Sequence, residues 1–372
     1  MIRVLVTGAR GFIGQNLVVA LRRREDVELV TFDIADPERR LDEALGDADI
    51  VFHLAGVNRP ATVDEFGIVN AGLTRHVVDR LSAQEHRPII VLTSSTQAVL
   101  DNPYGTSKLQ AESILKEYVD RDGGGAQVFR LPNVFGKWCR PNYNSVVATF
   151  CHNIAHGLPI TISDPAREIQ LVYIDDVVRK FGSILDSKQE LTFSFGEIQP
   201  VFSVTLQTLA DTLLSFKDIR TTLVAPDFSD PFVKRLYPSF LSYLDTTEFA
   251  YSLNQRTDDR GTLAELLKSR QFGQIFVSRT KPGITRGNHF HDSKIEKFCV
   301  IEGEAVVRFR HVVTDEMVAY QVKGTDFRVV DIPPGYTHSI ENTGSTELIT
   351  LFWSDEIFNP EMPDTYPAKV NQ

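Results

Sequence analysis

The feature that most constrains the fold is a change of hydrophobic pattern partway along the chain. In the first half, continuous apolar runs such as 2–7 (IRVLVT) and 87–95 (RPIIVLTSS) alternate with amphipathic stretches of helical spacing. Such runs are typical of parallel strands buried on both faces, so the alternation predicts a doubly wound α/β sheet. From about residue 260 the chain changes to short strands divided by turns such as 281–287 (KPGITRG). This part predicts a small all-β barrel or sandwich.

The length of 372 residues favours two domains, and we place them at residues 1–243 and 244–372. Apolar residues make up 42% and charged residues 24% of the chain, as in folded globular proteins. With a net charge of −10 and no basic block, we expect no binding to nucleic acid or to a membrane. The three cysteines show no CxxC spacing, and no apolar run is long enough to span a bilayer. The chain also enters a predicted strand at its very start. We therefore expect a cytoplasmic protein.

A glycine-rich loop follows the first predicted strand. The segment VTGARGFIG places Gly8, Gly11 and Gly14 between this strand and a helix. Glycines allow a sharp turn and a close approach to a pyrophosphate, and the helix N-terminus adds unpaired N–H groups. The spacing is GxxGxxG, and the alternative reading of such a loop is an ordinary structural turn. Its place after the first strand favours a dinucleotide site.

Two charged residues bear on the cofactor. Asp33 closes the second predicted strand, where it would hold a ribose 2′-hydroxyl or would cap a helix. Arg10 lies inside the glycine loop, where it would meet a 2′-phosphate or remain a solvated surface charge. Asp33 favours NAD by its charge and Arg10 favours NADP; we predict NADP(H), because an arginine in the loop can meet the 2′-phosphate.

A Tyr-Lys pair is placed for acid-base chemistry. Tyr104 and Lys108 stand four apart in NPYGTSK, so they share one face of a predicted helix. A nearby ammonium favours the phenolate, and a tyrosine tuned in this way would donate a proton to a carbonyl oxygen. Ser95, or its neighbour Ser94, ends the preceding strand and would bind the same oxygen. A lone YxxxK is usually just a helix face, but here three elements occur in the expected order.

These motifs, with HLAG (53–56), RLPNVFG (130–136) and LVYIDDVV (171–178), resemble the extended short-chain dehydrogenase/reductase family over residues 1–243. The resemblance implies a Rossmann-like fold and nicotinamide chemistry on a nucleotide-activated sugar. It implies Ser95, Tyr104 and Lys108 as catalytic residues, with Ser95, Arg130 and Asn133 on the substrate side and His53 in a structural role. Only eight residues separate Ser95 from Tyr104, fewer than is usual in the family. The implied cofactor-binding residues are Gly8, Arg10, Gly11, Phe12, Ile13, Gly14, Asp33, Leu54, Ala55, Gly56, Tyr104 and Lys108.

A second cluster of polar residues lies in the all-β part. His289 and His291 point to one face of a strand, Glu296 follows, and His338 lies in a separate block, PPGYTHSIEN. Three imidazoles and one carboxylate suit a divalent ion such as zinc, manganese, iron or nickel. An HxH pair alone is as often a surface feature. Four ligand-type residues in two blocks predict one metal ion, most simply zinc.

The two blocks resemble the cupin motifs, one running from Gly283 to Gly303 and the other from Pro333 to Asn342. The resemblance covers about residues 262–360 and implies a cupin barrel that holds the metal through His289, His291, Glu296 and His338. In the second motif the glycine that usually stands six positions before the proline is displaced to Gly324.

The whole chain resembles the CapF-type enzymes of capsular polysaccharide synthesis, through DNPYGTSKLQ, FGKWCRPNYNS, KPGITRGNH and IPPGYTHSIEN. This implies a bifunctional enzyme acting on a UDP-linked 4-keto-6-deoxy-2-acetamido sugar, with C3 epimerisation in the cupin followed by NADPH-dependent C4 reduction. The product would be UDP-2-acetamido-2,6-dideoxy-L-talose, and we expect a homodimer. The alternatives are a monofunctional reductase or epimerase with a structural cupin, and a non-catalytic NADP sensor.

Overall fold

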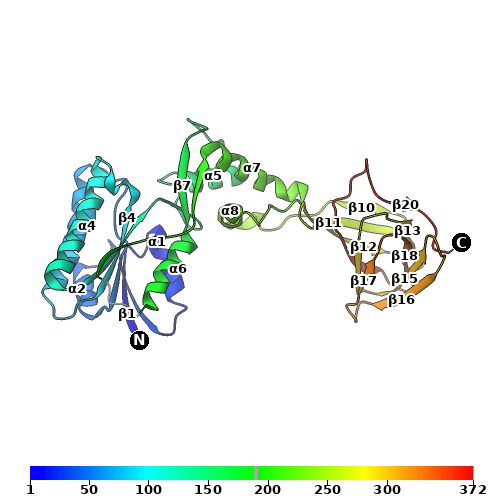
Figure 1. The fold of residues 1–372 in the computed structure, drawn as a ribbon, viewed down its shortest axis with the longest axis horizontal. Helices are drawn as coiled ribbons and strands as arrows, with labels where there is room; N and C mark the ends of the chain where they lie inside the picture. The colour runs from blue at the N-terminus through cyan, green and yellow to red at the C-terminus, as the bar shows by residue number, and fades with distance from the viewer. Residues whose placement is uncertain (188–191, 372) are drawn as a thin grey trace. The chain divides into compact units, whose positions relative to one another are not determined.

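A computed structural model describes residues 1–187 and 192–371, and the chain forms two compact units (Figure 1). The first unit comprises residues 1–214 and 235–244, and the second comprises residues 215–234 and 245–372. The chain therefore passes from one unit to the other three times, and the predicted boundary at 243/244 adjoins the last of these junctions.

The first unit is built on a parallel six-stranded sheet. Its strand order is β2-β1-β3-β4-β5-β8, and every neighbouring pair is parallel. Continuous apolar runs form the central strands β1 and β3, whose residues are mostly buried because both faces of the sheet are covered there. The strands are β1 (Ile2–Thr7), β2 (Val27–Phe32), β3 (Ile50–His53), β4 (Ile89–Ser95), β5 (Gly125–Leu131) and β8 (Phe193–Gly196).

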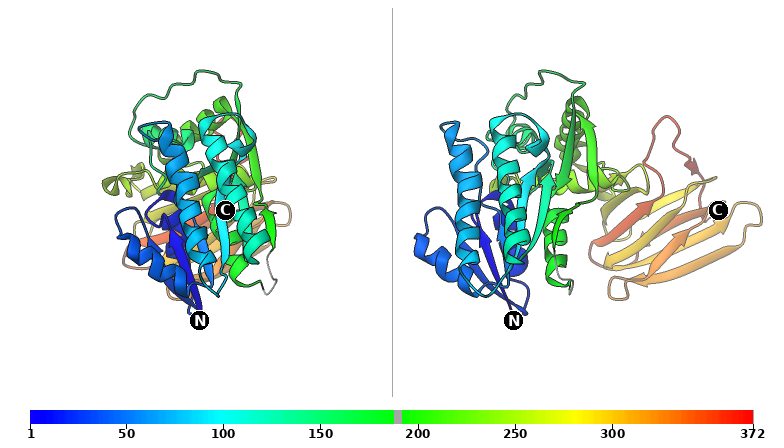
Figure 2. Two further views of the ribbon diagram at one scale, coloured as in Figure 1. Left: turned by 90° about the vertical axis from the view of Figure 1, so that its left-hand side faces the viewer. Right: turned by 60° about the vertical axis from the view of Figure 1, so that its left-hand side comes forward.

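Helices cover both faces of this sheet, as Figures 1 and 2 show. One core contains apolar side chains of α1 (Phe12–Leu21) and α6 (Ile174–Leu185). The core on the other face contains side chains of α2 (Glu38–Asp47), α3 (Leu73–Ser82) and α4 (Pro103–Asp122). The predicted doubly wound α/β fold is confirmed. A π-helix, η1 (Phe66–Gly72), precedes α3, and a 3-10 helix, η2 (Thr96–Val99), precedes α4.

A smaller three-stranded sheet has the order β6-β7-β9, and β8 of the parallel sheet lies between β7 and β9 along the chain. β7 pairs in parallel with β6 and antiparallel with β9. The remaining elements before the all-β part are β6 (Asn133–Phe135), α5 (Val146–Ala155), β7 (Glu168–Tyr173), β9 (Val201–Thr205), α7 (Leu206–Thr222), α8 (Pro231–Leu241) and η3 (Thr246–Glu248).

The second unit consists of two antiparallel sheets that enclose an apolar core. The first sheet has the order β10-β11-β12-β19-β14-β17 and the second β16-β15-β18-β13-β20. This confirms the predicted all-β fold and is consistent with a cupin barrel. The strands are β10 (Gln255–Asp258), β11 (Gly261–Ser269), β12 (Gly273–Thr280), β13 (Thr285–Phe290), β14 (Glu296–Glu302), β15 (Glu304–His311), β16 (Met317–Lys323), β17 (Val329–Ile332), β18 (Tyr336–Asn342), β19 (Leu348–Ser354) and β20 (Tyr366–Pro367).

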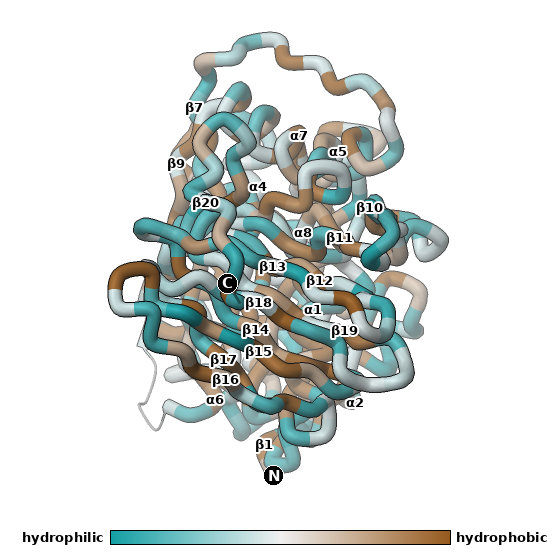
Figure 3. Tube along the Cα trace, turned by 90° about the vertical axis from the view of Figure 1, so that its right-hand side faces the viewer, coloured by the Kyte–Doolittle hydropathy of each residue, from teal (hydrophilic) through white to brown (hydrophobic). Residues whose placement is uncertain are grey.

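Alternation along the strands explains this core. In β15 the buried Ala305, Val307 and Phe309 alternate with more exposed residues. Figure 3 shows hydrophobic and hydrophilic stretches interspersed along the strands of this unit. Phe276 and Phe352 stack between the neighbouring strands β12 and β19, with ring centroids 4.7 Å apart. The apolar core lies between the two sheets, and β12 and β19 also bury polar side chains such as Ser278 and Thr350.

A short segment from before α8 completes the edge of β11. The N–H of Ala225 donates to Lys268 O, and the N–H of Lys268 donates to Leu223 O, both at 2.7 Å. Val224 forms an isolated parallel bridge with Lys268. Residues 223–225 therefore belong to the second unit although they precede part of the first along the chain.

Candidate functional site

The glycine loop joins β1 to α1 and approaches the chain beyond β3. Gly8 has φ +67°, and a Cβ at this position would lie 2.7 Å from the backbone of Ala55. A Cβ on Gly14 would lie 2.1 Å from the carbonyl oxygen of Gly8, so both positions require glycine. Gly11 begins α1 without a side-chain cap, and no acidic residue lies in its first turn. The first N–H groups of α1 are thus left for an anion, and the loop fits a dinucleotide pyrophosphate.

Asp33 supports the glycine loop through hydrogen bonds. One carboxylate oxygen accepts the N–H of Arg10 at 2.7 Å, and the other accepts the N–H of Ile34 at 2.8 Å. The carboxylate thus ties the end of β2 to the loop, a local role in addition to the ribose contact predicted for it. The Arg10 guanidinium lies 3.7 Å from Asp36 and its side chain is 66% exposed, so it is available to an added anion.

The segment after β3 connects the glycine loop to the Tyr-Lys pair. Ala55 contacts Gly8, while a Cβ on Gly56 would lie 3.1 Å from the Lys108 Nζ atom. His53 is buried between the hydroxyls of Thr7 and Thr74, at 2.8 and 3.1 Å from its two ring nitrogens. Burial, with the charge of Lys108, lowers the pKa of His53 to about 3. A neutral histidine held on both sides fits the structural role predicted for it.

Ser95, Tyr104 and Lys108 lie together. Ser95 ends β4, and its hydroxyl forms a hydrogen bond with the Tyr104 side chain. The buried Lys108 Nζ lies 5.9 Å from the centroid of the Tyr104 ring and donates to Thr93 O at 3.1 Å. The short connection noticed in the sequence is occupied by η2, and Ser95 still reaches the tyrosine. The neighbouring Ser94 is engaged elsewhere, because its hydroxyl donates to Glu112 at 2.5 Å.

The pKa of Tyr104 differs from the sequence prediction, which expected the nearby Lys108 to lower it. Burial raises the pKa of the Tyr104 hydroxyl above its ordinary value, and the hydrogen bond with Ser95 opposes this shift. Burial also lowers the pKa of Lys108 to about 8, while the charge of Glu112 opposes that change. The expected lowering of the tyrosine pKa by the lysine is therefore not found: desolvation is the main cause of the shift, and only Ser95 opposes it. A raised pKa keeps Tyr104 protonated at neutral pH, the form that donates a proton.

We predict that Lys108→Met removes part of the pH dependence of stability. The pKa of Lys108 is about 8 in the folded chain and 10.5 for an ordinary lysine, so the unfolded chain holds this proton more tightly. The free energy of unfolding should rise between these pH values for wild type and lack this rise in the variant. Urea unfolding at about pH 7 and about pH 10 measures the difference. Lys116→Met, at an exposed position of the same helix, is the control; equal slopes for all three proteins would refute the prediction.

The two other residues predicted on the substrate side have different surroundings. Arg130 forms a bidentate ion pair with the buried Glu112, with its shortest contact at 2.6 Å, and lies 4.6 Å from the centroid of the Phe195 ring. Asn133 is exposed in β6 and donates to Gln170 O at 3.3 Å. Arg130 is thus held mainly by its own chain, whereas Asn133 remains accessible. The sequence reasoning missed Glu112, which binds both Ser94 and Arg130, because a helical glutamate gives no local signal of burial.

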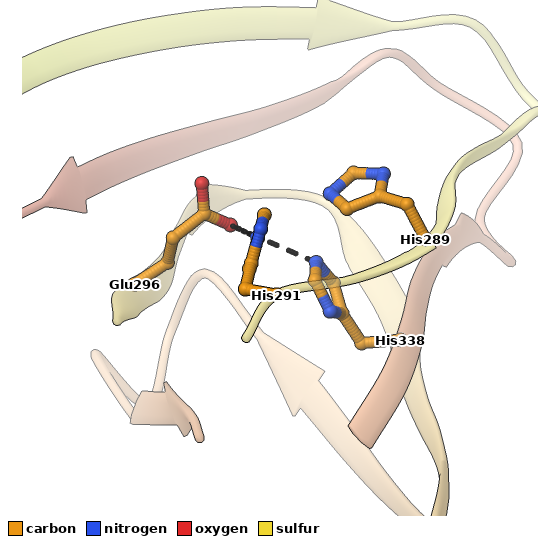
Figure 4. Close-up of side chains that lie close together, drawn as sticks. All are labelled: His289, His291, Glu296 and His338. Atoms are coloured by element: carbon orange, nitrogen blue, oxygen red, sulfur yellow. Dashed lines mark ion pairs between the residues drawn. The ribbon is translucent and has the colours of Figure 1, made fainter. Parts of the chain in front are cut away.

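The four predicted metal ligands meet at one point of the β unit. His289 lies in β13 and pairs with His338 in β18, His291 follows β13, and Glu296 begins β14. One possible ligand atom from each residue lies within 4.8 Å of those of the others, and Figure 4 shows the side chains converging. The Nε2 atoms of His291 and His338 lie 3.4 and 3.6 Å from Glu296 Oε2.

The chemistry of the cluster fits a divalent ion. Both of these buried Nε2 atoms lack a hydrogen-bond partner among the described residues. Burial, followed by the charges of His338 and His291, lowers the pKa of His289 to about 4, so this ring is neutral at neutral pH. Burial acts to raise the pKa of Glu296, but contacts with His291 and His338 hold it well below its ordinary value. Neutral imidazoles and an ionised carboxylate are the forms that bind metal.

The comparisons with known proteins agree with this arrangement. The model of the NAD dependent epimerase/dehydratase family matches residues 4–193, half of the chain. The chain is also 41% identical over 370 residues to the UDP-2-acetamido-2,6-beta-L-arabino-hexul-4-ose reductase of Pseudomonas aeruginosa, covering 100% of this chain and 99% of that one. The chain belongs to the NAD dependent epimerase/dehydratase family. A second model, the polysaccharide biosynthesis C-terminal domain, matches residues 256–366 of this family member.

A comparison with solved structures shows that the similarity covers almost the whole chain of this epimerase/dehydratase family member. The crystal structure of the capsular polysaccharide assembling protein CapF from Staphylococcus aureus matches with a TM-score of 0.91 and 44% identity, covering 99% of this chain and 100% of that one. The resemblance to CapF-type enzymes is confirmed. A UDP-glucuronic acid 4-epimerase of Bacillus cereus, at 18% identity and a TM-score of 0.52, covers 59% of this chain and 83% of that one and shares the fold alone. The family and these relatives support an NAD(P)-binding oxidoreductase. Across residues 1–187 and 192–371, no helix is long and apolar enough to cross a membrane.

Proposed function

We propose that the chain is a bifunctional nucleotide-sugar enzyme that epimerises C3 and then reduces C4 of a UDP-linked 4-keto-6-deoxy-2-acetamido sugar. The convergence of Ser95, Tyr104 and Lys108 beside the glycine loop carries the reductase part. The Pseudomonas aeruginosa relative, described as a reductase of a UDP-linked hexul-4-ose, supports the substrate class. The product would be UDP-2-acetamido-2,6-dideoxy-L-talose. Homodimerisation and a cytoplasmic location stay predictions from the sequence.

The order of the two steps follows from the chemistry of the sugar. A ketone at C4 acidifies the C3 proton, because the carbanion left at C3 is delocalised onto the ketone oxygen. A base removes this proton, and an acid returns one to the opposite face, so the sugar is neither oxidised nor reduced. Once C4 carries a hydroxyl, the C3 proton is no longer acidic. Epimerisation therefore precedes reduction.

The reductase residues have separate tasks. Bound NADPH supplies the hydride that reduces C4. Tyr104 delivers a proton to the oxygen at C4, and Ser95 positions that oxygen through its hydroxyl. Lys108 holds a positive charge beside the tyrosine, which stabilises the phenolate left after the proton has moved. Arg10 favours NADPH over NADH, since its exposed guanidinium lies in the loop where a 2′-phosphate would be bound.

The cupin residues have a role in the first step. His289, His291, Glu296 and His338 would hold one divalent ion, most simply Zn²⁺. When bound, this ion supplies positive charge that stabilises an enolate. His291 and His338 are almost completely buried, whereas His289 and Glu296 are partly exposed, so the site is shielded from water on the side of the first two residues.

NMR of the UDP-linked 4-keto sugar in deuterated water tests the proposal directly. Three incubations are compared: enzyme alone, enzyme with NADPH and enzyme with NADH. We expect deuterium at C3 without cofactor, a C3-inverted 4-hydroxy product with NADPH, and slower reduction with NADH. Reduction without deuterium at C3 would indicate a monofunctional reductase. Binding of NADPH without any turnover would indicate a sensor.

A further inference from the structure

Residues 363–370 form a segment, here called the C-terminal strap, that contacts the neighbours of all three histidines of the cluster. β20, within the strap, pairs with the end of β13, placing Pro367 opposite His289 and Tyr366 opposite Phe290. The rings of Phe290 and Tyr366 lie 5.3 Å apart. The strap is thus fastened to the strand that carries His289 and that leads directly into His291.

The strap contacts the His291 ring directly. The Nδ1 atom of His291 lies 2.5 Å from the backbone oxygen of Asp364. A carbonyl oxygen only accepts hydrogen bonds, so the ring proton lies on Nδ1 and the lone pair on Nε2. Nε2 is the buried atom that has no hydrogen-bond partner and lies 3.4 Å from Glu296. The strap therefore selects the tautomer of His291 that binds a metal through Nε2.

The Asp364 side chain fixes the loop between His291 and Glu296. One carboxylate oxygen accepts the N–H of Asp292 at 2.9 Å. The other accepts the N–H groups of Ser293 and Lys294 at 3.0 and 2.8 Å, and the Ser293 hydroxyl at 2.9 Å. These four hydrogen bonds to one carboxylate hold the loop in a single conformation. That conformation sets the distance between the candidate ligands His291 and Glu296.

The Lys294 side chain ties the same loop to the strap a second time. Its Nζ atom donates to Pro363 O at 3.2 Å and to the hydroxyl of Thr365 at 3.0 Å. The side chain is buried, which is uncommon for a lysine without hydrogen-bond partners of this kind. The loop and the strap are therefore joined by both the carboxylate of Asp364 and the ammonium group of Lys294.

The other two histidines are held through their chain neighbours. Asn288 forms a bulge in β13 with φ +62°, and its backbone and side-chain oxygens accept the N–H groups of Ala368 and Val370 at 2.9 and 3.2 Å. Bulges re-aim the adjacent side chain, which here is His289. Thr337, next to His338, donates through its hydroxyl to Ala368 O at 2.6 Å.

We infer that the C-terminal strap is a positioning element of the metal site, with Asp364 as its central residue. The inference rests on the proposed metal site. The strap makes no contribution to the ligand set; it aims the histidines and holds the loop before Glu296. Its loss would weaken metal binding while all four ligands remain in the chain.

Asp364→Asn tests this with little change of shape. Asparagine also tolerates the positive φ of Asp364, +36°, and keeps one acceptor oxygen. In either orientation of the amide, however, its NH2 group faces a backbone donor, the N–H of Asp292 or those of Ser293 and Lys294, where an acceptor is needed. We expect Zn²⁺ affinity, measured on the full chain by competition with a chelator, to fall about 10–100-fold. The visible spectrum of the Co²⁺-loaded variant should also change, because it reports the ligand geometry.

Two controls separate positioning from stability. Asp326→Asn makes the same change at an exposed carboxylate after β16 and should bind Zn²⁺ like wild type. Val307→Ala removes packing in the core of the unit and should lower the unfolding midpoint of the metal-free protein without lowering Zn²⁺ affinity. Wild-type affinity in Asp364→Asn, or an equal loss in Val307→Ala, would overturn the inference. A wild-type chain that takes up no Zn²⁺ would instead refute the proposed metal site.

Discussion

Replacement of Tyr104 by phenylalanine should lower the rate of NADPH oxidation with the 4-keto sugar by about 10²-fold or more, the usual contribution of a general acid. The variant keeps the ring, its contact with Phe66 and its distance from Lys108, and loses only the hydroxyl that meets Ser95. Deuterium incorporation at C3 should persist, because the cupin residues are unchanged. Stopped-flow absorbance of NADPH measures the first quantity and NMR the second.

A matched control lies on the same helix. Tyr118 is buried in α4, and its hydroxyl donates to Pro88 O at 3.4 Å, away from the glycine loop. Tyr118→Phe removes the same atom and should leave the reduction rate unchanged. Normal reduction by Tyr104→Phe would assign the proton donor elsewhere.

Replacement of His338 by alanine should cause the largest loss of metal. This ring is completely buried and lies within 4.5 Å of the His289 ring and 5.3 Å of the His291 ring, measured between centroids. Removal of a direct ligand should weaken Zn²⁺ binding by more than the roughly 10–100-fold loss that follows from changing a residue that only orients one. Elemental analysis of dialysed protein and chelator competition provide the measurement. C3 exchange should fall with metal content, while NADPH binding at the glycine loop stays close to wild type.

Because His338 also fills space in the core, a second ligand variant guards against misfolding. His289 is partly exposed, so His289→Ala removes a ligand at less cost to packing. His311→Ala changes a histidine of the same unit that lies outside the cluster and should retain the metal. Full Zn²⁺ occupancy in both ligand variants would exclude the proposed site.

The positions of the site residues could be predicted where a local pattern carries them. Helical spacing placed Tyr104 and Lys108 on one face, and the rings of His289 and His291, two residues apart, lie together although His291 is just beyond the end of β13. The direction of the tyrosine pKa could not be predicted in this way, because burial depends on the packed surroundings of the side chain. Local spacing shows which charged group is near but not how much solvent is excluded.

Long-range contacts explain most of what the sequence reasoning missed. Asp364 lies 73 residues from His291, and nothing in the composition of the last segment marks it as part of a metal site. β11 shows the same effect, since its segment TLAELLK consists mainly of good helix formers. Pairing with β10 and β12 overrides that preference and keeps the segment extended. The neighbouring β12 (GQIFVSRT), by contrast, has the β-branched and aromatic residues that favour an extended conformation.

The path of residues 223–225 has a consequence for dividing the gene. A fragment that starts at residue 244 would begin after the segment that pairs with Lys268, leaving part of one border of β11 without its hydrogen-bond partners. Such bare strand borders recruit other chains and promote aggregation. Conversely, a fragment that ends at residue 243 would carry residues 215–234 without the strand they complete. The two units therefore cannot be separated cleanly by dividing the chain at one point. For the same reason, exchange of the cupin unit between proteins in evolution would require residues 215–234 to be exchanged with it.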